Sequence, residues 1–137
     1  MLARNQVSGA FALVVLLALL ASACGSGGTL SGKALSQESK SMQSLAAEGA
    51  LLGRDSAAGR TTHIYTRVHS EDLYKAASKS AKSLQSATTK PALQPKLRKV
   101  ASLASKVSAD LKRLGHASKA EQSRLAGELE ASAKELG

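Results

Sequence analysis

Residues 93–115 read LQPKLRKVASLASKVSADLKRLG and carry the most regular hydrophobic pattern of the chain. The apolar positions follow one another at alternating spacings of four and three: Leu93, Leu97, Val100, Ala104, Val107, Leu111 and Leu114. Sustained spacing of this kind places one apolar seam along a helix and is typical of helices that pack side by side. Pro95 falls in the first turn and Gly115 follows the last seam residue, as expected at the two ends of a helix. This segment therefore predicts an amphipathic helix packed against other helices.

Two further helices are expected before this segment. Residues 31–53 predict one helix, with Gly49 as a weak point in its seam. The apolar residues of that seam are Leu35, Met42, Leu45 and Leu52. After a loop over residues 54–59, a second helix is expected from Thr61 or Thr62, either of which can cap its first turn, to residue 87. The residues expected to face the core from this second helix are Ile64, Val68, Leu73, Ala77, Ala81 and Leu84.

The C-terminal residues predict a fourth helix. Ser118 and Glu121 have the spacing of a capping box, and Gly127 weakens the helix that follows. The apolar residues of this helix are Leu125, Leu129, Ala133 and Leu136.

Short connections favour antiparallel neighbours, and no alternating strand pattern follows the N-terminal segment. We therefore expect an all-α fold, a small antiparallel bundle of about four amphipathic helices over residues 33–137. Aromatic residues make up 2% of the chain, so its core must be built from smaller side chains that bury less area.

The first 24 residues have the layout of a secretory leader. Arg4 is the only charged residue before Cys24. Residues 10–21 form an unbroken apolar run, which is shorter than the roughly 17–20 residues that a membrane-spanning helix requires. The small residues Ser22 and Ala23 directly precede Cys24, the only cysteine of the chain.

The segment LASACGSGG, residues 20–28, resembles the lipobox of bacterial lipoproteins, in which a peptidase cuts before the cysteine and the cysteine becomes the lipidated first residue. The resemblance implies a signal peptide over residues 1–23 and a diacylglyceryl group on Cys24. It also implies a location in the cell envelope, anchored in a membrane and facing outside the cytoplasm. The glycine-rich residues 24–32 are then expected to form a flexible tether. The alternatives are a secreted protein with a free thiol at Cys24, or an uncleaved anchor.

Positive charge is concentrated in one part of the chain. The whole chain has a net charge of +9, and residues 73–119 contain eleven basic residues against Asp110 alone. The basic residues expected to form a binding face are Lys75, Lys79, Lys82, Lys96, Lys99, Lys106 and Arg113. Such a face attracts anionic lipid, an acidic envelope polymer or an acidic protein, although a charged helix face can also serve solubility alone. The leader and the lack of aromatic stacking residues disfavour a nucleic-acid partner.

The sequence contains no recognisable catalytic constellation. It has no Gly-x-Ser-x-Gly elbow, no Ser-x-x-Lys pair and no phosphate-binding glycine loop after a strand. His63, His69 and His116 lack the spacing of metal ligands and are expected on the surface. We therefore expect a non-enzymatic, lipid-anchored scaffold or binding module with no cofactor besides the covalent lipid. The alternative is a carrier of a small ligand or metal in the bundle interior, although no seam position offers His or Cys.

Overall fold

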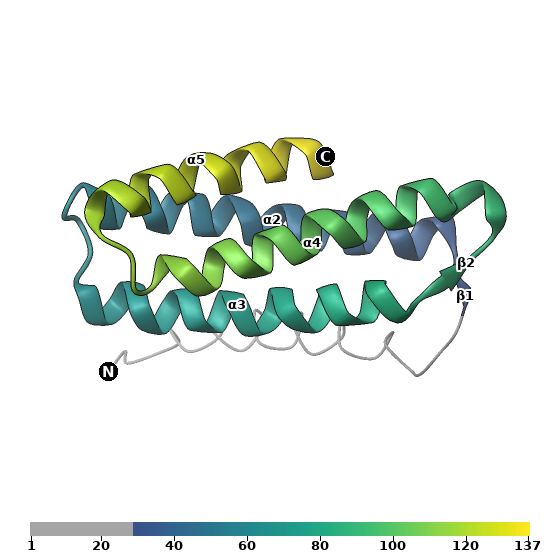
Figure 1. Ribbon diagram of the computed structural model, residues 1–137, viewed down its shortest axis with the longest axis horizontal. Coiled ribbons are helices and arrows are strands. Elements are labelled where there is room, and N and C mark those ends of the chain that lie inside the picture. Colours follow the sequence, from purple (N-terminus) through teal and green to yellow (C-terminus); the bar gives the residue numbers. More distant parts are fainter. Residues whose placement is uncertain (1–28) are drawn as a thin grey trace, which may run out of the picture.

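A computed structural model describes residues 29–137, and four long helices make up most of that part of the chain (Figure 1). The helices are α2 (Gly32–Ala57), α3 (His63–Ser86), α4 (Gln94–Leu114) and α5 (Lys119–Leu136). The predicted leader, Cys24 and the first part of the predicted tether lie outside the described residues. The predicted all-α fold of about four antiparallel helices is confirmed.

Hydroxyl side chains cap three of the helices at their first turn. Ser31 accepts a hydrogen bond from the amide of Ala34 at 3.1 Å, and Thr62 accepts one from Tyr65 at 3.2 Å. Ser118 accepts from the amide of Glu121 at 3.3 Å, as the capping-box spacing predicted. These bonds satisfy amide groups that have no partner within the helix.

Helix α2 continues past its predicted end at Gly53. The prediction treated residues 54–59 as a loop, whereas α2 runs to Ala57. Ala58 is the C-cap of α2, and Gly59 follows it with a φ of 73°, the left-handed conformation that commonly follows a helix end. Gly53 is buried inside the helix, so here glycine serves packing and does not mark a turn.

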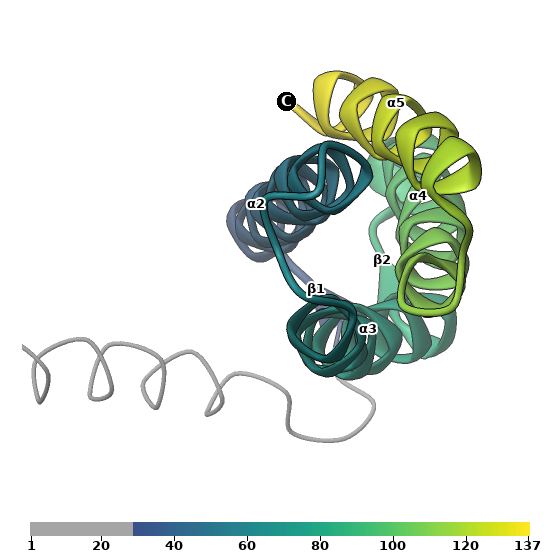
Figure 2. The same cartoon turned by 90° about the vertical axis from the view of Figure 1, so that its left-hand side faces the viewer.

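The helices associate mainly as two pairs, α2 with α5 and α3 with α4. Seen end-on, the four helices surround a shared interior, with α3 and α5 on opposite sides of the bundle (Figure 2). Each helix buries one stripe and exposes the rest. None of the helices within residues 29–137 combines the length and apolarity needed to cross a membrane.

The seam of α4 provides a large part of the core. Six of its seven predicted positions are buried: Leu97, Val100, Ala104, Val107, Leu111 and Leu114. The seventh, Leu93, is partly buried and belongs to a short 3-10 helix, η2 (Pro91–Leu93), that precedes α4. The seam prediction is thus confirmed along the whole of α4.

Glycines in α2 allow the helices to approach closely. A Cβ atom on Gly49 would lie 2.4 Å from Cδ2 of Leu111 and 3.1 Å from Cδ1 of Leu129. A Cβ on Gly53 would lie 3.0 Å from the Cβ of Ala126. Gly49, which the sequence presented as a weak point, is therefore, like Gly53, a place where α2 meets side chains of both α4 and α5.

The prediction for the start of α3 was wrong. Ile64 and Val68 were expected in the core, but they are 67% and 54% exposed. Thr66 and Ser70 are buried in their place. The reason is helical spacing, since Val68 and Leu73 are five residues apart, whereas Ser70 and Thr66 continue the stripe of Leu73 at spacings of three and four.

Hydrogen bonds make the polar residue Thr66 acceptable in the interior. Its hydroxyl donates to the hydroxyl of Ser56 at 3.0 Å or to the carbonyl of Thr62 at 3.1 Å, and lies 2.9 Å from the hydroxyl of Thr61. Buried hydroxyls are tolerated when they are bonded in this way. The network also ties the end of α2 to the start of α3.

A minimal parallel sheet joins the N-terminal segment to the end of α3. Strand β1 (Thr29–Leu30) pairs with β2 (Thr88–Thr89), and the Thr89 hydroxyl donates to the Leu30 carbonyl at 2.8 Å. Residues 29–32 were expected in the tether, and no strand was expected there. Two-residue strands are too short to show an alternating pattern, which explains the difference.

Two glycine substitutions test the packing of α2. Gly127 lies in the interior of α5 with no atom within 4 Å of an added Cβ, so Gly127→Ala is expected to raise the free energy of unfolding by about 0.5–1 kcal/mol. Gly49→Ala is expected to lower it by about 1 kcal/mol or more, because the added methyl group overpacks the core. Urea unfolding followed by circular dichroism measures both. Equal stabilisation by the two substitutions would contradict the close approach at Gly49.

Candidate functional site

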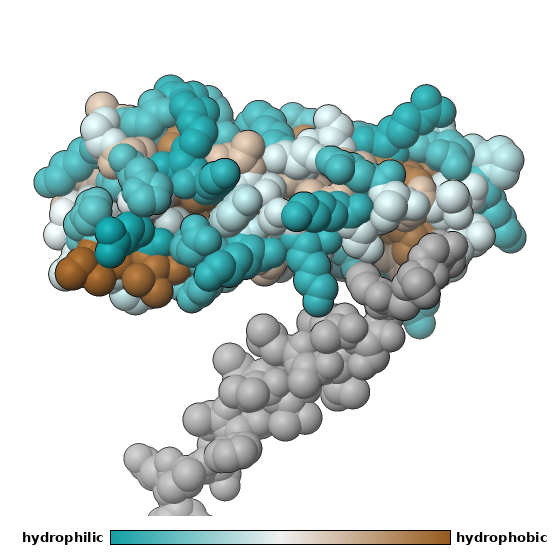
Figure 3. Space-filling view, turned by 60° about the horizontal axis from the view of Figure 1, so that its bottom comes forward, coloured by the Kyte–Doolittle hydropathy of each residue, from teal (hydrophilic) through white to brown (hydrophobic). Residues whose placement is uncertain are grey.

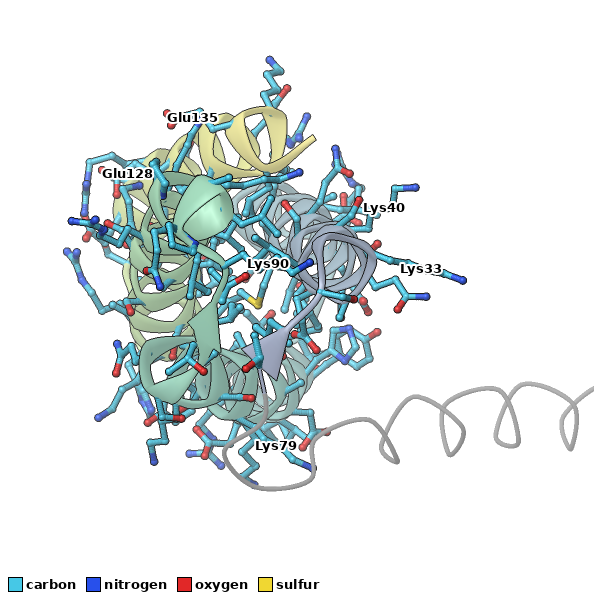
Figure 4. All side chains as sticks on the ribbon, turned by 90° about the vertical axis from the view of Figure 1, so that its right-hand side faces the viewer. Lys33, Lys40, Lys79, Lys90, Glu128 and Glu135 are labelled. Carbon is cyan, nitrogen blue, oxygen red and sulfur yellow. The ribbon has the colours of Figure 1, made fainter. Side chains whose placement is uncertain are left out.

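Three of the predicted basic residues form one row on the outer face of α3. Lys75, Lys79 and Lys82 are all exposed, and at about 100° per residue they fall within about 60° of one another around the helix. Lys79 extends away from the bundle in Figure 4. The opposite face of the same helix is buried in the bundle, so the backbone that carries the lysine row is packed in place.

The lysines of this row have few internal partners. Nζ of Lys75 lies 3.8 Å from a carboxylate oxygen of Glu71, one turn earlier, and both side chains are largely exposed. Such an exposed pair contributes little to stability. No carboxylate within residues 29–137 lies within salt-bridge distance of Lys79 or Lys82. The row is therefore available to an external anion.

The remaining four predicted residues lie on α4 and do not extend this row. Lys96 and Lys99 are exposed in its first half, and the salt bridges of the described part of the chain do not include them. Lys106 and Arg113 instead face α5, where Nη2 of Arg113 lies 2.5 Å from Oε1 of Glu121. Lys79 and Glu128, a partner of Lys106, extend from different sides of the bundle in Figure 4. The predicted single basic face is thus divided.

Lys106 is engaged by a buried acid. Its Nζ lies 3.3 Å from Oδ2 of Asp110, whose side chain is almost fully buried, and 3.9 Å from Oε2 of Glu128. Burial raises the pKa of the Asp110 carboxyl, and the positive charge of Lys106 opposes that rise. A buried carboxylate needs a partner of this kind. The position of Lys106 therefore indicates a structural role between α4 and α5.

A second ion-pair cluster continues along the same interface. Arg124 donates hydrogen bonds to Glu121 and to Glu128 on its own helix. The hydrogen bond from Arg124 is the main reason that the pKa of Glu121 lies below its usual value, and the charge of Arg113 adds to the effect. The acids of α5 thus pair with Lys106 and Arg113, whereas the lysine row of α3, and Lys96 and Lys99 of α4, remain exposed.

Sequence reasoning missed an exposed apolar cluster on the same helix. It consists of Ile64, Tyr65 and Val68, of which Tyr65 and Val68 are each 54% exposed. Figure 3 shows hydrophobic surface gathered at the end of the molecule where α3 begins. The ring of Tyr65 stacks on His69 at 5.5 Å, and Nε2 of His69 lies 2.8 Å from Oε1 of Glu48. The irregular five-residue step from Val68 to Leu73 was the signal that could have revealed this cluster.

The bundle interior is filled by side chains. Its buried positions hold mainly Leu, Ala and Val, and the described residues contain no group of three or more His, Cys, Asp or Glu that could hold a metal. Two hollows lie at the surface. One, of about 480 Å³, is lined by Glu71, Lys112, Arg113, His116, Ala117 and Glu121. The other, of about 440 Å³, lies along α2 and α5.

Comparisons with known proteins found no relative. The chain matches no known protein family, no curated protein and no solved structure. Three features of this chain point to a function: the leader with Cys24, the lysine row of α3, and the apolar cluster beside it.

Proposed function

We propose that this protein is a non-enzymatic helical module of the bacterial cell envelope, anchored to a membrane by a lipid on Cys24 and binding an anionic partner through α3. The observation that carries the binding proposal is the row of Lys75, Lys79 and Lys82. These side chains are exposed, lie on one face and have at most a weak internal partner. The lipobox-like leader supports the anchor.

The two parts of the proposal support each other physically. A single acyl chain gives only marginal membrane binding, whereas two chains, or one chain with a basic patch, give stable binding. Each basic residue near an anionic membrane surface contributes about 1 kcal/mol. Anionic lipid headgroups, an acidic envelope polymer and an acidic protein all share the negative charge that the lysine row attracts. A lipid on Cys24 would keep the bundle where such partners are concentrated.

Metabolic labelling tests the anchor. The wild-type chain, produced in bacteria that are fed a fatty-acid probe, is expected to take up the label and to partition into detergent. Cys24→Ala is expected to lose the label because the acceptor thiol is gone, while the matched substitution Ser26→Ala keeps it. A wild-type chain that takes up no label would rule out the lipoprotein assignment.

Vesicle binding tests the lysine row. A protein that begins at residue 25 is expected to bind vesicles containing phosphatidylglycerol more strongly than vesicles of phosphatidylcholine alone, and less strongly as salt rises. Replacing Lys75, Lys79 and Lys82 with Gln is expected to weaken binding by about tenfold or more. The helix should remain, since Gln is nearly as good a helix former as Lys.

A second triple variant is the matched control for this measurement. Replacing Lys33, Lys40 and Lys119 with Gln removes the same charge from elsewhere on the molecule, and Figure 4 shows Lys33 and Lys40 extending in a different direction from Lys79. The control should retain most of the binding. Equal losses in the two variants would mean that net charge alone attracts the protein and that α3 has no special role.

A further inference from the structure

We infer that the outer face of α3 docks along an anionic lipid bilayer, with Ile64 and Val68 entering the acyl-chain boundary while Lys75, Lys79 and Lys82 contact the headgroups. We call these five residues the docking row. The inference rests on the proposed function and deepens it, because it names the lipid bilayer as the anionic partner and fixes the orientation of the bundle on it.

The docking row is continuous on one side of the helix. At about 100° per residue, Ile64 and Val68 fall within the same 60° sector as the three lysines. The row extends from Ile64 to Lys82, which is about 27 Å along the helix axis at 1.5 Å per residue. The whole row points away from the core, since the buried stripe of α3 lies on the other side.

The chemistry of the row matches the layers of a bilayer surface. Helices that lie in a membrane interface place apolar side chains about 5–10 Å into the boundary and keep basic residues at the headgroups. Tyr65 lies beside Ile64 and has the amphipathic ring that is enriched at membrane interfaces. Along the helix, the acidic residues Glu71 and Asp72 lie between the apolar and the basic part of the row. At about 100° per residue they fall one on each side of it, and a carboxylate oxygen of Glu71 lies 3.8 Å from Nζ of Lys75.

The position of β1 places the proposed lipid at the basic end of the row. Strand β1 pairs with β2, which directly follows α3, so the chain enters the bundle beside the C-terminal end of this helix (Figure 1). Five peptide units separate Cys24 from Thr29 and can span at most about 18 Å. A lipid on Cys24 would hold the basic end close to the bilayer. The apolar end, about 27 Å away, would then be a second point of contact, and α3 would lie parallel to the membrane.

A second copy of the chain fits this row less well than a bilayer does. Parallel pairing of two rows would bring lysines against lysines, and antiparallel pairing would place Ile64 of one copy opposite Lys82 of the other. Both arrangements bury unpaired charge, which is costly. A bilayer offers separate layers for the apolar and the charged side chains.

Depth-dependent quenching tests the inference on the full chain in its lipidated form. In that form the thiol of Cys24 carries the lipid, so Ile64→Cys and Ser123→Cys each provide one site for a bimane fluorophore. Ser123 is exposed and belongs to α5, the helix that lies on the opposite side of the bundle from α3 (Figure 2). In vesicles of phosphatidylglycerol with brominated acyl chains, we expect quenching of the fluorophore at position 64 and none at position 123.

The outcomes separate this inference from the proposed function. A lipidated, vesicle-bound chain without quenching at position 64 overturns the inference and leaves the anchor intact. Cross-linking between copies at position 64 without quenching identifies a second copy as the occupant and also overturns it. A chain that takes up no lipid and does not bind vesicles overturns both.

A polar substitution provides a second, independent measurement. Ile64→Gln is expected to weaken the binding of the full chain to anionic vesicles by roughly five- to tenfold without changing its salt dependence, because no charge is altered. The matched control is Leu51→Gln, since Leu51 is 58% exposed and lies on the same face of α2 as Lys33 and Lys40 at about 100° per residue. Equal effects of the two substitutions would contradict docking through α3.

Discussion

At Gly49, the backbone of α2 is covered directly by the side chains of Leu111 from α4 and Leu129 from α5. The space is so tight that a single added methyl group would lie 2.4 Å from Leu111. Because α2 packs mainly with α5 and α3 packs mainly with α4, this contact is one of the places where the two pairs meet, together with the packing of α2 on α3 and of α4 on α5. A core with few aromatic side chains is built from small residues, and it reaches a high packing density only if the helix backbones approach closely. Close packing matters because dispersion attraction between side chains falls off quickly when gaps open between them.

This packing also determines which surface is free. Helices α4 and α5 face each other through ion pairs, in which Lys106 and Arg113 of α4 pair with acids of α5. Within residues 29–137, Lys79 and Lys82 on the outer face of α3 have no salt-bridge partner, and Thr66 and Ser70 on its inner face leave Ile64 and Val68 outside. The same arrangement that completes the core therefore exposes an apolar cluster and a lysine row on one helix, the surface on which the proposed binding function depends.

Local patterns were sufficient to predict the helices but not their partners. The seam from Leu97 to Leu114 was predictable because seven-residue periodicity is visible in sequence alone. The exposure of Ile64 was not, because a buried Thr66 is acceptable only once the hydroxyl of Ser56, on another helix, is in reach. Likewise, the sequence could not show that Glu121 of α5 pairs with Arg113 and that Glu128 of α5 lies near Lys106. Those pairings depend on how the helices are arranged.

The free energy of unfolding of Leu111→Ala tests the packing at Gly49 most directly. Leu111 is fully buried against Gly49, so removing its side chain should lower stability by about 2–5 kcal/mol, the usual cost of a cavity in a packed core. Leu51→Ala, at an exposed position, should change stability by no more than about 0.5 kcal/mol. If Leu111→Ala were no more destabilising than Leu51→Ala, Leu111 would not be packed in the core and the helices would not be joined at this contact.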